Sequence, residues 1–238
     1  MPQITSASRV MSSNLPAADP ALEIPAEGLL PQGVELAATV AAKICHDLIS
    51  PVSAIVSGLD LLEDDDSADM KEEAMKLIAQ SAKKLAAQLS FARVAYGASA
   101  AADTFDAREL HKLVAGVFDT VRAELDWQVQ APALNKPAAR AILNLAQIGA
   151  SALPMGGKAT LTAGEMDGSF VIGLEARGSR ARLRPETAEG LKGLPLSDGM
   201  AGQWVQPYYL YALVKEAGGT VVAAAEDEHV AAQIRLPL

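Results

Sequence analysis

Two long helical patterns joined by a short acidic segment occupy residues 33–96, and they constrain the fold more than any other feature. In the first, from about Gly33 to Glu63, apolar residues recur at steps of three and four: Ile44, Leu48, Val52, Ile55, Leu59 and Leu62. In the second, from about Met70 to Tyr96, they form a heptad seam: Met75, Ile78, Ala82, Leu85, Leu89, Ala92 and Tyr96. Such spacings are typical of amphipathic helices that pack nearly parallel to other helices.

The connection between the two patterns is short, so we expect an antiparallel helical hairpin. The acidic run from Glu63 to Asp66 would end the first helix, and Asp69 with Glu72 would form a capping box at the start of the second. Two helices alone cannot bury both apolar seams. Residues 33–97 are therefore predicted to form a homodimer, in which two hairpins make a four-helix bundle.

After residue 103 the pattern changes to shorter helices and strands. We expect helices at about 106–124, 137–153, 185–191 and 207–217, and strands at about 127–129, 158–163, 169–176, 220–225 and 229–236. Asp167-Gly168 suits a tight hairpin turn, and Gly218-Gly219 suits the end of a helix. The predicted fold class is α+β, with an α/β sandwich over residues 104–238 following the hairpin. Residues 1–32 show no periodicity and are predicted to be a disordered tail.

Composition narrows the class of function. The formal net charge is −9, which disfavours nucleic-acid binding and favours a protein partner with a basic docking face. Cys45 is the single cysteine, so no disulfide can form within one chain and a reducing compartment fits. We find neither a secretory leader nor an apolar run of about 20 residues. The chain is therefore expected to be cytoplasmic, without membrane or nucleic-acid partners.

His46 is the residue most suited to chemistry. At about 100° per helical residue it points away from the apolar stripe, toward solvent, where an incoming phosphoryl group could reach it. Imidazole has a nucleophilic neutral form near neutral pH. Asp47 could accept a hydrogen bond from the other ring nitrogen and fix the tautomer, and Pro51 should bend the helix just beyond. From spacing alone, an ordinary exposed histidine remains an alternative.

The run His46-Asp47-Leu48-Ile49-Ser50-Pro51-Val52 resembles the H-box of sensor histidine kinases, in which an acid follows the histidine and proline stands at the fifth position after it. Extended through residues 57–64, and with later stretches such as Leu125-Asp126-Trp127-Gln128, the sequence resembles the alphaproteobacterial ChpT family of histidine phosphotransferases. The resemblance covers about residues 35–238. It implies a homodimeric helical-hairpin bundle, an ATPase-like domain that binds no ATP, and reversible phosphoryl transfer between receiver domains through His46.

The kinase chemistry is missing from the second domain. Asn144 matches the first asparagine of the kinase nucleotide-binding helix, but the metal-binding position four residues on is Ile148, which cannot ligate Mg²⁺. The expected Asp-x-Gly-x-Gly is replaced by residues 175–180, Glu-Ala-Arg-Gly-Ser-Arg. We therefore expect no cofactor and no metal site in this chain, and Mg²⁺ to come from the partner receiver domain.

The function predicted is a phosphorelay histidine phosphotransferase, with His46 as phosphoacceptor and Asp47 orienting it. Ile49, Ser53 and Val56 lie on the exposed flank of the same helix and are predicted to contact the receiver. By resemblance, the partners would be the receiver of a hybrid histidine kinase and regulators like CtrA and CpdR. Two alternatives stay open: an active histidine kinase with an altered ATP site, and a non-catalytic dimeric scaffold that binds receivers.

Overall fold

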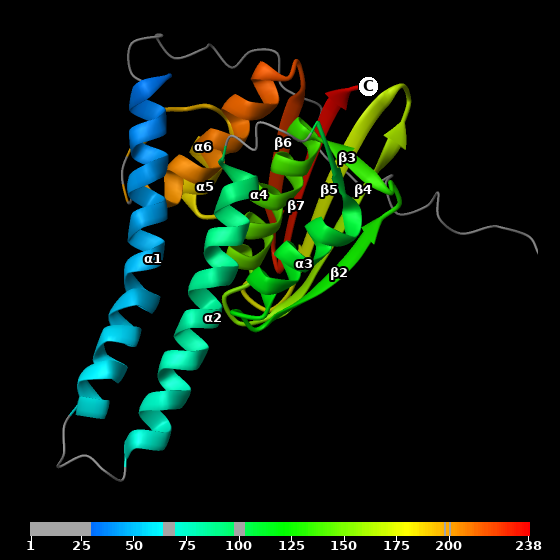
Figure 1. The fold of residues 1–238 in the computed structure, drawn as a ribbon. Coiled ribbons are helices and arrows are strands. Elements are labelled where there is room, and N and C mark those ends of the chain that lie inside the picture. The colour runs from blue at the N-terminus through cyan, green and yellow to red at the C-terminus, as the bar shows by residue number, and fades with distance from the viewer. Residues whose placement is uncertain (1–29, 64–69, 98–102, 198, 200) are drawn as a thin grey trace, which may run out of the picture.

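The computed structural model describes residues 30–63, 70–97, 103–197, 199 and 201–238. The tail predicted over residues 1–32 lies almost wholly outside these ranges, as do Asp69 of the predicted capping box and the segment from 98 to 102. The two long helices are α1, Val34–Glu63, and α2, Lys71–Ala95. They pack side by side as the predicted hairpin, and much of their length projects beyond the rest of the molecule (Figure 1).

Small residues form the contact between α1 and α2. Gly58 is buried, and a Cβ atom added to it would lie 2.6 Å from Cγ1 of Ile78 and 3.3 Å from the carbonyl oxygen of Ala74. Ala74 and Ser81 are buried on the facing side of α2. Side chains this small allow the two helix backbones to approach closely.

The single hairpin leaves part of the predicted apolar seams uncovered. Val52, Leu59, Met75 and Leu89 belong to the predicted apolar seams, and all four are exposed in the single chain. Each follows directly after a residue on the α1–α2 contact side, namely Pro51, Gly58, Ala74 and the half-buried Gln88. The hairpin thus has two neighbouring apolar seams, one that joins α1 to α2 and one that faces outward. We call the outward residues Val52, Leu59, Met75 and Leu89 the outer seam.

A leucine at position 58 is expected to destabilise the fold. Because Gly58 faces Ile78 without free space, Gly58→Leu should lower the free energy of unfolding by about 2 kcal/mol through overpacking. Ser57→Leu, at the exposed neighbouring position, is the matched control and should change it by less than about 0.5 kcal/mol. Urea unfolding followed by circular dichroism measures both, and equal midpoints for the two variants would refute the close-contact explanation.

The C-terminal domain is a two-layer α/β sandwich. Its mixed sheet has the strand order β2-β4-β5-β7-β6. The strands are β2, Ala123–Val129; β4, Gly157–Met166; β5, Ser169–Arg177; β6, Thr220–Glu226; and β7, His229–Pro237. Only the β2–β4 pair is parallel; the other neighbours are antiparallel. Burial alternates along β4, so one face of the sheet is covered and the other faces solvent.

Helices α3, Ala107–Phe118; α4, Lys136–Ala152; and α6, Ala201–Glu216 pack on that sheet, and α5, Pro185–Leu191, packs on α6 (Figure 1). Helix α4 is the centre of the domain core, with 12 of its 17 residues buried. The Asn135 side chain caps it by accepting a hydrogen bond from the Ala138 N–H at 3.0 Å. The predicted α+β class and the hairpin followed by a sandwich are both confirmed.

Several predicted boundaries were wrong. Helix α3 ends at Phe118 rather than near residue 124. The Thr120 hydroxyl donates a hydrogen bond to the carbonyl oxygen of Val117, and strand β2 already begins at Ala123. Helix α6 begins six residues before Pro207, where Trp204 and Val205 are buried against α1. The short strands β1, Thr104–Asp106, and β3, Ala133–Asn135, pair with each other and were not predicted.

The hairpin is fixed to the sandwich at two places. Val40 of α1 packs with Trp204, Val205 and Tyr208 of α6 in a separate apolar cluster. At the end of α2, the Tyr96 hydroxyl donates to Oε1 of Gln147 in α4 at 3.2 Å. These contacts hold the upper halves of α1 and α2 against the sandwich and leave the lower halves free of it (Figure 1).

The expectation that no segment resembles a membrane span needs correction. By length and composition α1 could cross a membrane, with a mean hydropathy of 1.3 over its most apolar window. This is weak evidence, because an apolar helix of a helical bundle passes the same test. Here α1 packs along α2 and against α6, and two of its apolar residues, Val52 and Leu59, belong to the outer seam.

Candidate phosphoacceptor site

His46 lies on the solvent side of α1, as the helical spacing predicted. Its side chain is 88% exposed. Nδ1 lies 3.6 Å from Oδ1 of Asp47, the next residue along the helix, which is longer than a hydrogen bond. Because Nδ1 is the ring nitrogen beside the carboxylate, Nε2 is the nitrogen left for a reaction partner. The site can therefore present Nε2, the ring nitrogen farther from Asp47, to a reaction partner.

Asp47 is also held by a residue that the sequence analysis did not single out. Lys43, one turn earlier on α1, donates from Nζ to Oδ2 of Asp47 at 2.6 Å. The lysine side chain is only 15% exposed. The four-residue spacing from Lys43 to Asp47 was the signal that could have found this pair, since such residues are neighbours on a helix.

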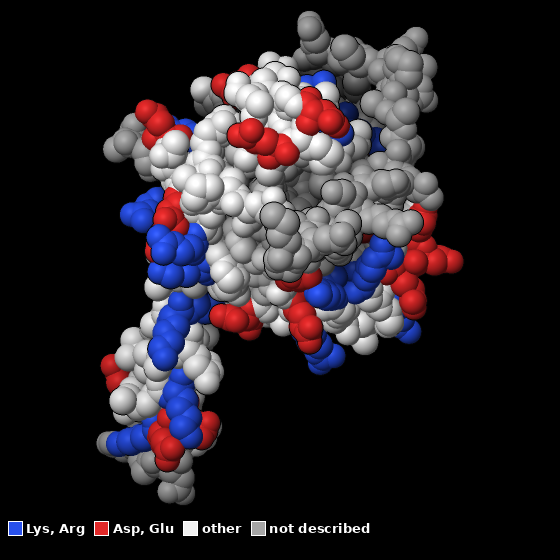
Figure 2. Space-filling view, turned by 90° about the vertical axis from the view of Figure 1, so that its right-hand side faces the viewer, with Lys and Arg blue, Asp and Glu red and all other residues white. Residues whose placement is uncertain are grey.

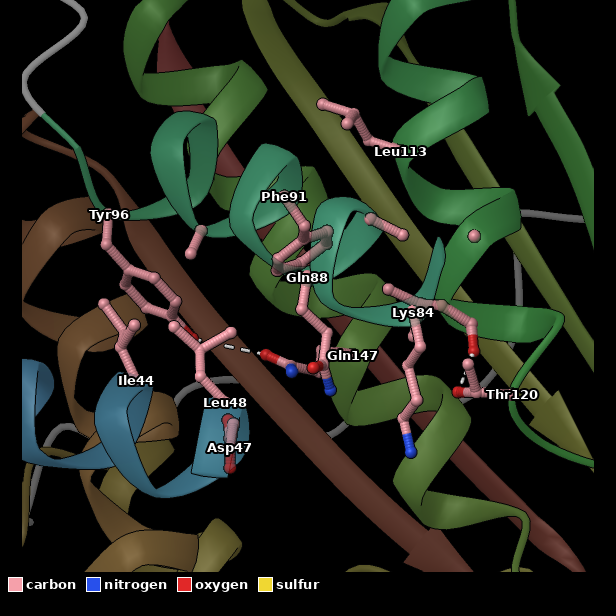
Figure 3. A pocket seen from close by; sticks show the side chains of 14 residues that line it. Ile44, Asp47, Leu48, Lys84, Gln88, Phe91, Tyr96, Leu113, Thr120 and Gln147 are labelled. Atoms are coloured by element: carbon pink, nitrogen blue, oxygen red, sulfur yellow. Dashed lines mark hydrogen bonds between the residues drawn. The ribbon is translucent and has the colours of Figure 1, made fainter. Parts of the chain in front are cut away.

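A cavity of about 110 Å³ lies between the hairpin and the C-terminal domain next to Asp47. It is lined by residues of α1, α2, α3 and α4, and Figure 3 shows Asp47 at one side of it with Tyr96 and Gln147 nearby. Burial raises the pKa of Tyr96 well above its usual value, and the charge of Asp47 adds to the shift. Tyr96 therefore stays protonated and acts as a hydrogen-bond donor rather than as a base.

The residues predicted to contact a receiver lie on an exposed surface. Ile49 and Val56 are exposed apolar side chains, and Ser53 between them is exposed as well. Helix α2 is basic, although the net charge of the whole chain is negative. It carries five Lys or Arg residues against two Glu, and Figure 2 shows Lys and Arg gathered along the hairpin. A partner with acidic groups would match α2, in contrast to the basic docking face expected from the net charge of −9.

Helix α4, whose Asn144 was compared with a kinase nucleotide-binding asparagine in the sequence, uses its polar groups in contacts inside the protein. Asn144 is fully buried, and its amide donates to the carbonyl of Arg140 at 2.9 Å and to that of Ala95 at 3.4 Å. The Gln206 amide of α6 donates to the Asn144 carbonyl at 2.8 Å. Ile148 is buried in the domain core. Among the described residues there is no group of three or more His, Cys, Asp or Glu side chains that could hold a metal ion.

Comparisons with known proteins define the class. A family model described as the histidine phosphotransferase C-terminal domain matches residues 107–229, more than half of the chain. The chain therefore belongs to the histidine phosphotransferases.

The relatives identify the type. Protein phosphotransferase ChpT of Brucella abortus (strain 2308) is 36% identical over 199 residues, which are 82% of this chain and 93% of the relative. A solved structure of a bacterial phosphotransferase is 31% identical, with a TM-score of 0.75, and the match covers 86% of this chain and 99% of that one. The chain is thus a phosphotransferase of the ChpT type, an enzyme of a phosphorelay, and the resemblance seen in its sequence is confirmed.

Proposed function

We propose that His46 carries the phosphoryl group, passing it reversibly between the receiver domains of response regulators. The observation that carries this proposal is the pair His46 and Asp47: an imidazole almost fully open to solvent, with a carboxylate beside one of its two nitrogens. An exposed ring allows another protein's acyl phosphate to approach in line. The neighbouring carboxylate stabilises the positive charge that the ring gains when it is phosphorylated.

The transfer step needs no base, because no proton leaves the reacting groups. Nε2 of neutral His46 attacks the phosphorus atom of the receiver's aspartyl phosphate. An N–P bond forms, and the bond between the phosphorus and the carboxyl oxygen of the aspartate breaks. The electron pair of the broken bond remains on the receiver's aspartate, which leaves as a carboxylate. His46 keeps its Nδ1 proton and becomes a phosphorylated imidazolium facing Asp47. Mg²⁺ would belong to the receiver, where it neutralises phosphoryl charge.

The docking surface for receivers would be the exposed flank of α1 next to His46. Ile49, Ser53 and Val56 follow His46 on that helix and would contact the receiver beside the reacting groups. The basic side chains of α2 would attract the carboxylates that surround a receiver's phosphoaspartate. The ChpT-type resemblance favours the receiver of a hybrid histidine kinase as donor, and CtrA-like and CpdR-like regulators as acceptors, in the cytoplasm.

The homodimer is part of the same proposal. The outer seam leaves four apolar side chains uncovered along the projecting hairpin, and their heptad-like spacing suits packing against another helix pair. A second copy of the hairpin would cover both helices at once and complete a four-helix bundle. His46 lies on a different side of α1 from Val52 and Leu59, so the bundle would leave it accessible.

The C-terminal domain would bind no nucleotide. Its Asn144 is already committed to hydrogen bonds inside the domain, and Ile148 offers no oxygen to a metal. An active kinase would need this helix face open to ATP and Mg²⁺. A pure scaffold would have no use for the carboxylate beside an exposed imidazole.

The phosphate source distinguishes these functions. Incubated with receiver domains of the source organism carrying labelled phosphate, the protein is expected to become labelled within seconds to minutes; with labelled ATP alone it should stay unlabelled. Gel autoradiography reads both reactions. Labelling from ATP alone would support the kinase, and binding of phosphorylated receivers without any labelling would support the scaffold.

A further inference from the structure

We infer that Lys43 is a positioning residue for phosphoryl transfer at His46, acting through Asp47. This inference rests on the proposed function of His46 and adds a third member to the site. The three residues lie within one and a quarter turns of α1: the Lys43 ammonium contacts one oxygen of Asp47, and the other oxygen faces the His46 ring.

The ion pair differs from an ordinary surface pair. Lys43 Nζ lies 2.6 Å from Asp47 Oδ2 with the lysine side chain 15% exposed, whereas Lys76 lies 2.8 Å from Glu72 on α2 with its side chain 53% exposed. Both pairs have the same four-residue spacing. A cation shielded from water is screened less by solvent and salt, so the Lys43–Asp47 pair should hold its geometry more firmly than the Lys76–Glu72 pair.

The consequence for His46 is geometric. Asp47 Oδ2 is occupied by Lys43, which fixes the carboxylate rotamer and leaves Oδ1 3.6 Å from Nδ1 of His46. A small rotation of the exposed ring would bring Nδ1–H into hydrogen-bond range when a receiver docks. Without Lys43, the carboxylate would be free to turn toward water or the neighbouring cavity, and the ring would lose its oriented acceptor.

No other lysine or arginine in the described part of the chain forms an ion pair with Asp47. Lys84 of α2 lines the same cavity, and Gln147 of α4 faces it. Tyr96, directly after α2, is neutral, and its hydroxyl donates a hydrogen bond to Gln147. Lys43 is therefore the cation that sets the position of Asp47.

The test measures single-turnover transfer to the full chain from the receiver domain that labels wild-type protein fastest, over a range of receiver concentrations. Lys43→Gln is expected to lower the maximal rate about tenfold and to leave the half-saturating concentration unchanged. Lys43→Arg should restore most of the rate, since it keeps a cation at the same helical position. Lys112→Gln, which removes an exposed ion pair with Glu109 on α3, away from the proposed docking surface, should behave as wild type.

The double variant decides whether Lys43 acts through Asp47. Asp47→Asn alone should lower the maximal rate by about 10²-fold, and Lys43→Gln added to it should change the rate less than about twofold. If the rate losses of the two single variants multiply in the double variant, the inference is overturned. It is also overturned if Lys43→Gln changes the half-saturating receiver concentration at an unchanged maximal rate, because Lys43 would then be a docking residue. A wild-type rate in Lys43→Gln overturns it as well. If His46→Gln still accepts phosphate, the proposed function fails instead.

Discussion

Replacing His46 with Gln is expected to abolish phosphoryl transfer, with a rate at least about 10³-fold below that of the wild-type protein. Glutamine has a similar length and a good helix propensity, so α1 should remain intact. It has no nucleophilic nitrogen, because the lone pair of an amide nitrogen is delocalised into the carbonyl group. Since His46 is almost fully exposed, its replacement leaves no cavity or unpaired group in the fold.

The other histidines provide the control. His111 is exposed on α3 of the C-terminal domain and stacks on Trp127 with ring centroids 5.2 Å apart. His111→Gln should transfer at the wild-type rate, measured with the same labelled receiver. If His111→Gln lost transfer while His46→Gln kept it, the phosphoacceptor would be in the C-terminal domain and the site on α1 would be misassigned.

Carboxylates in the outer seam are expected to separate the two protomers. In the proposed dimer Val52 and Leu59 become buried, so Val52→Glu with Leu59→Glu would place unpaired charges in an apolar interface. Each such charge costs several kcal/mol, and the dissociation constant should rise by at least about 10²-fold. In the free hairpin both positions are exposed, so the monomer should keep its helix content.

Sedimentation equilibrium over a range of protein concentrations measures this effect. Val121→Glu with Met155→Glu is the matched control, because it introduces the same two charges at exposed apolar residues of the C-terminal domain. The control should remain a dimer. A wild-type protein that sediments as a monomer, or a double variant that stays dimeric, would show that the outer seam is not the dimer interface.

The hairpin could be predicted because each helix repeats its apolar residues over many turns. The repetition did not show which side of α1 meets α2 within one hairpin: Pro51 and Gly58 are buried, whereas Val52 and Leu59 remain exposed in the single chain. Close packing of the two helices selected the small residues, and the larger ones were left for the outer face. A helical repeat thus predicts that a face is apolar but does not say which neighbour covers it.

Element ends in the sandwich depended on contacts between distant residues. Val121 continues the apolar spacing of α3, but residue 123 onward pairs with β4, more than thirty positions later, and this pairing ends the helix earlier. Pro207 looked like a helix start, but burial of Trp204 against α1 adds helical turns before it. Local propensity could not supply either contact.

The site itself was predicted in part. The orientation of His46 and its neighbour Asp47 followed from helical geometry alone, because both lie on one helix. Lys43 was visible only as a charged residue four positions before Asp47. Its low exposure, which distinguishes it from Lys76, results from tertiary packing around α1 and could not be read from the sequence.

Phosphorus NMR of the protein labelled with ¹⁵N-histidine, recorded after transfer from a phosphorylated receiver, tests the central claim most directly. We predict one phosphoramidate resonance, coupled to Nε2 of a single histidine and absent from His46→Gln. A phosphoryl group bound to an oxygen atom, or to the nitrogen of His111 or His229, would contradict the assignment of His46 as the carrier.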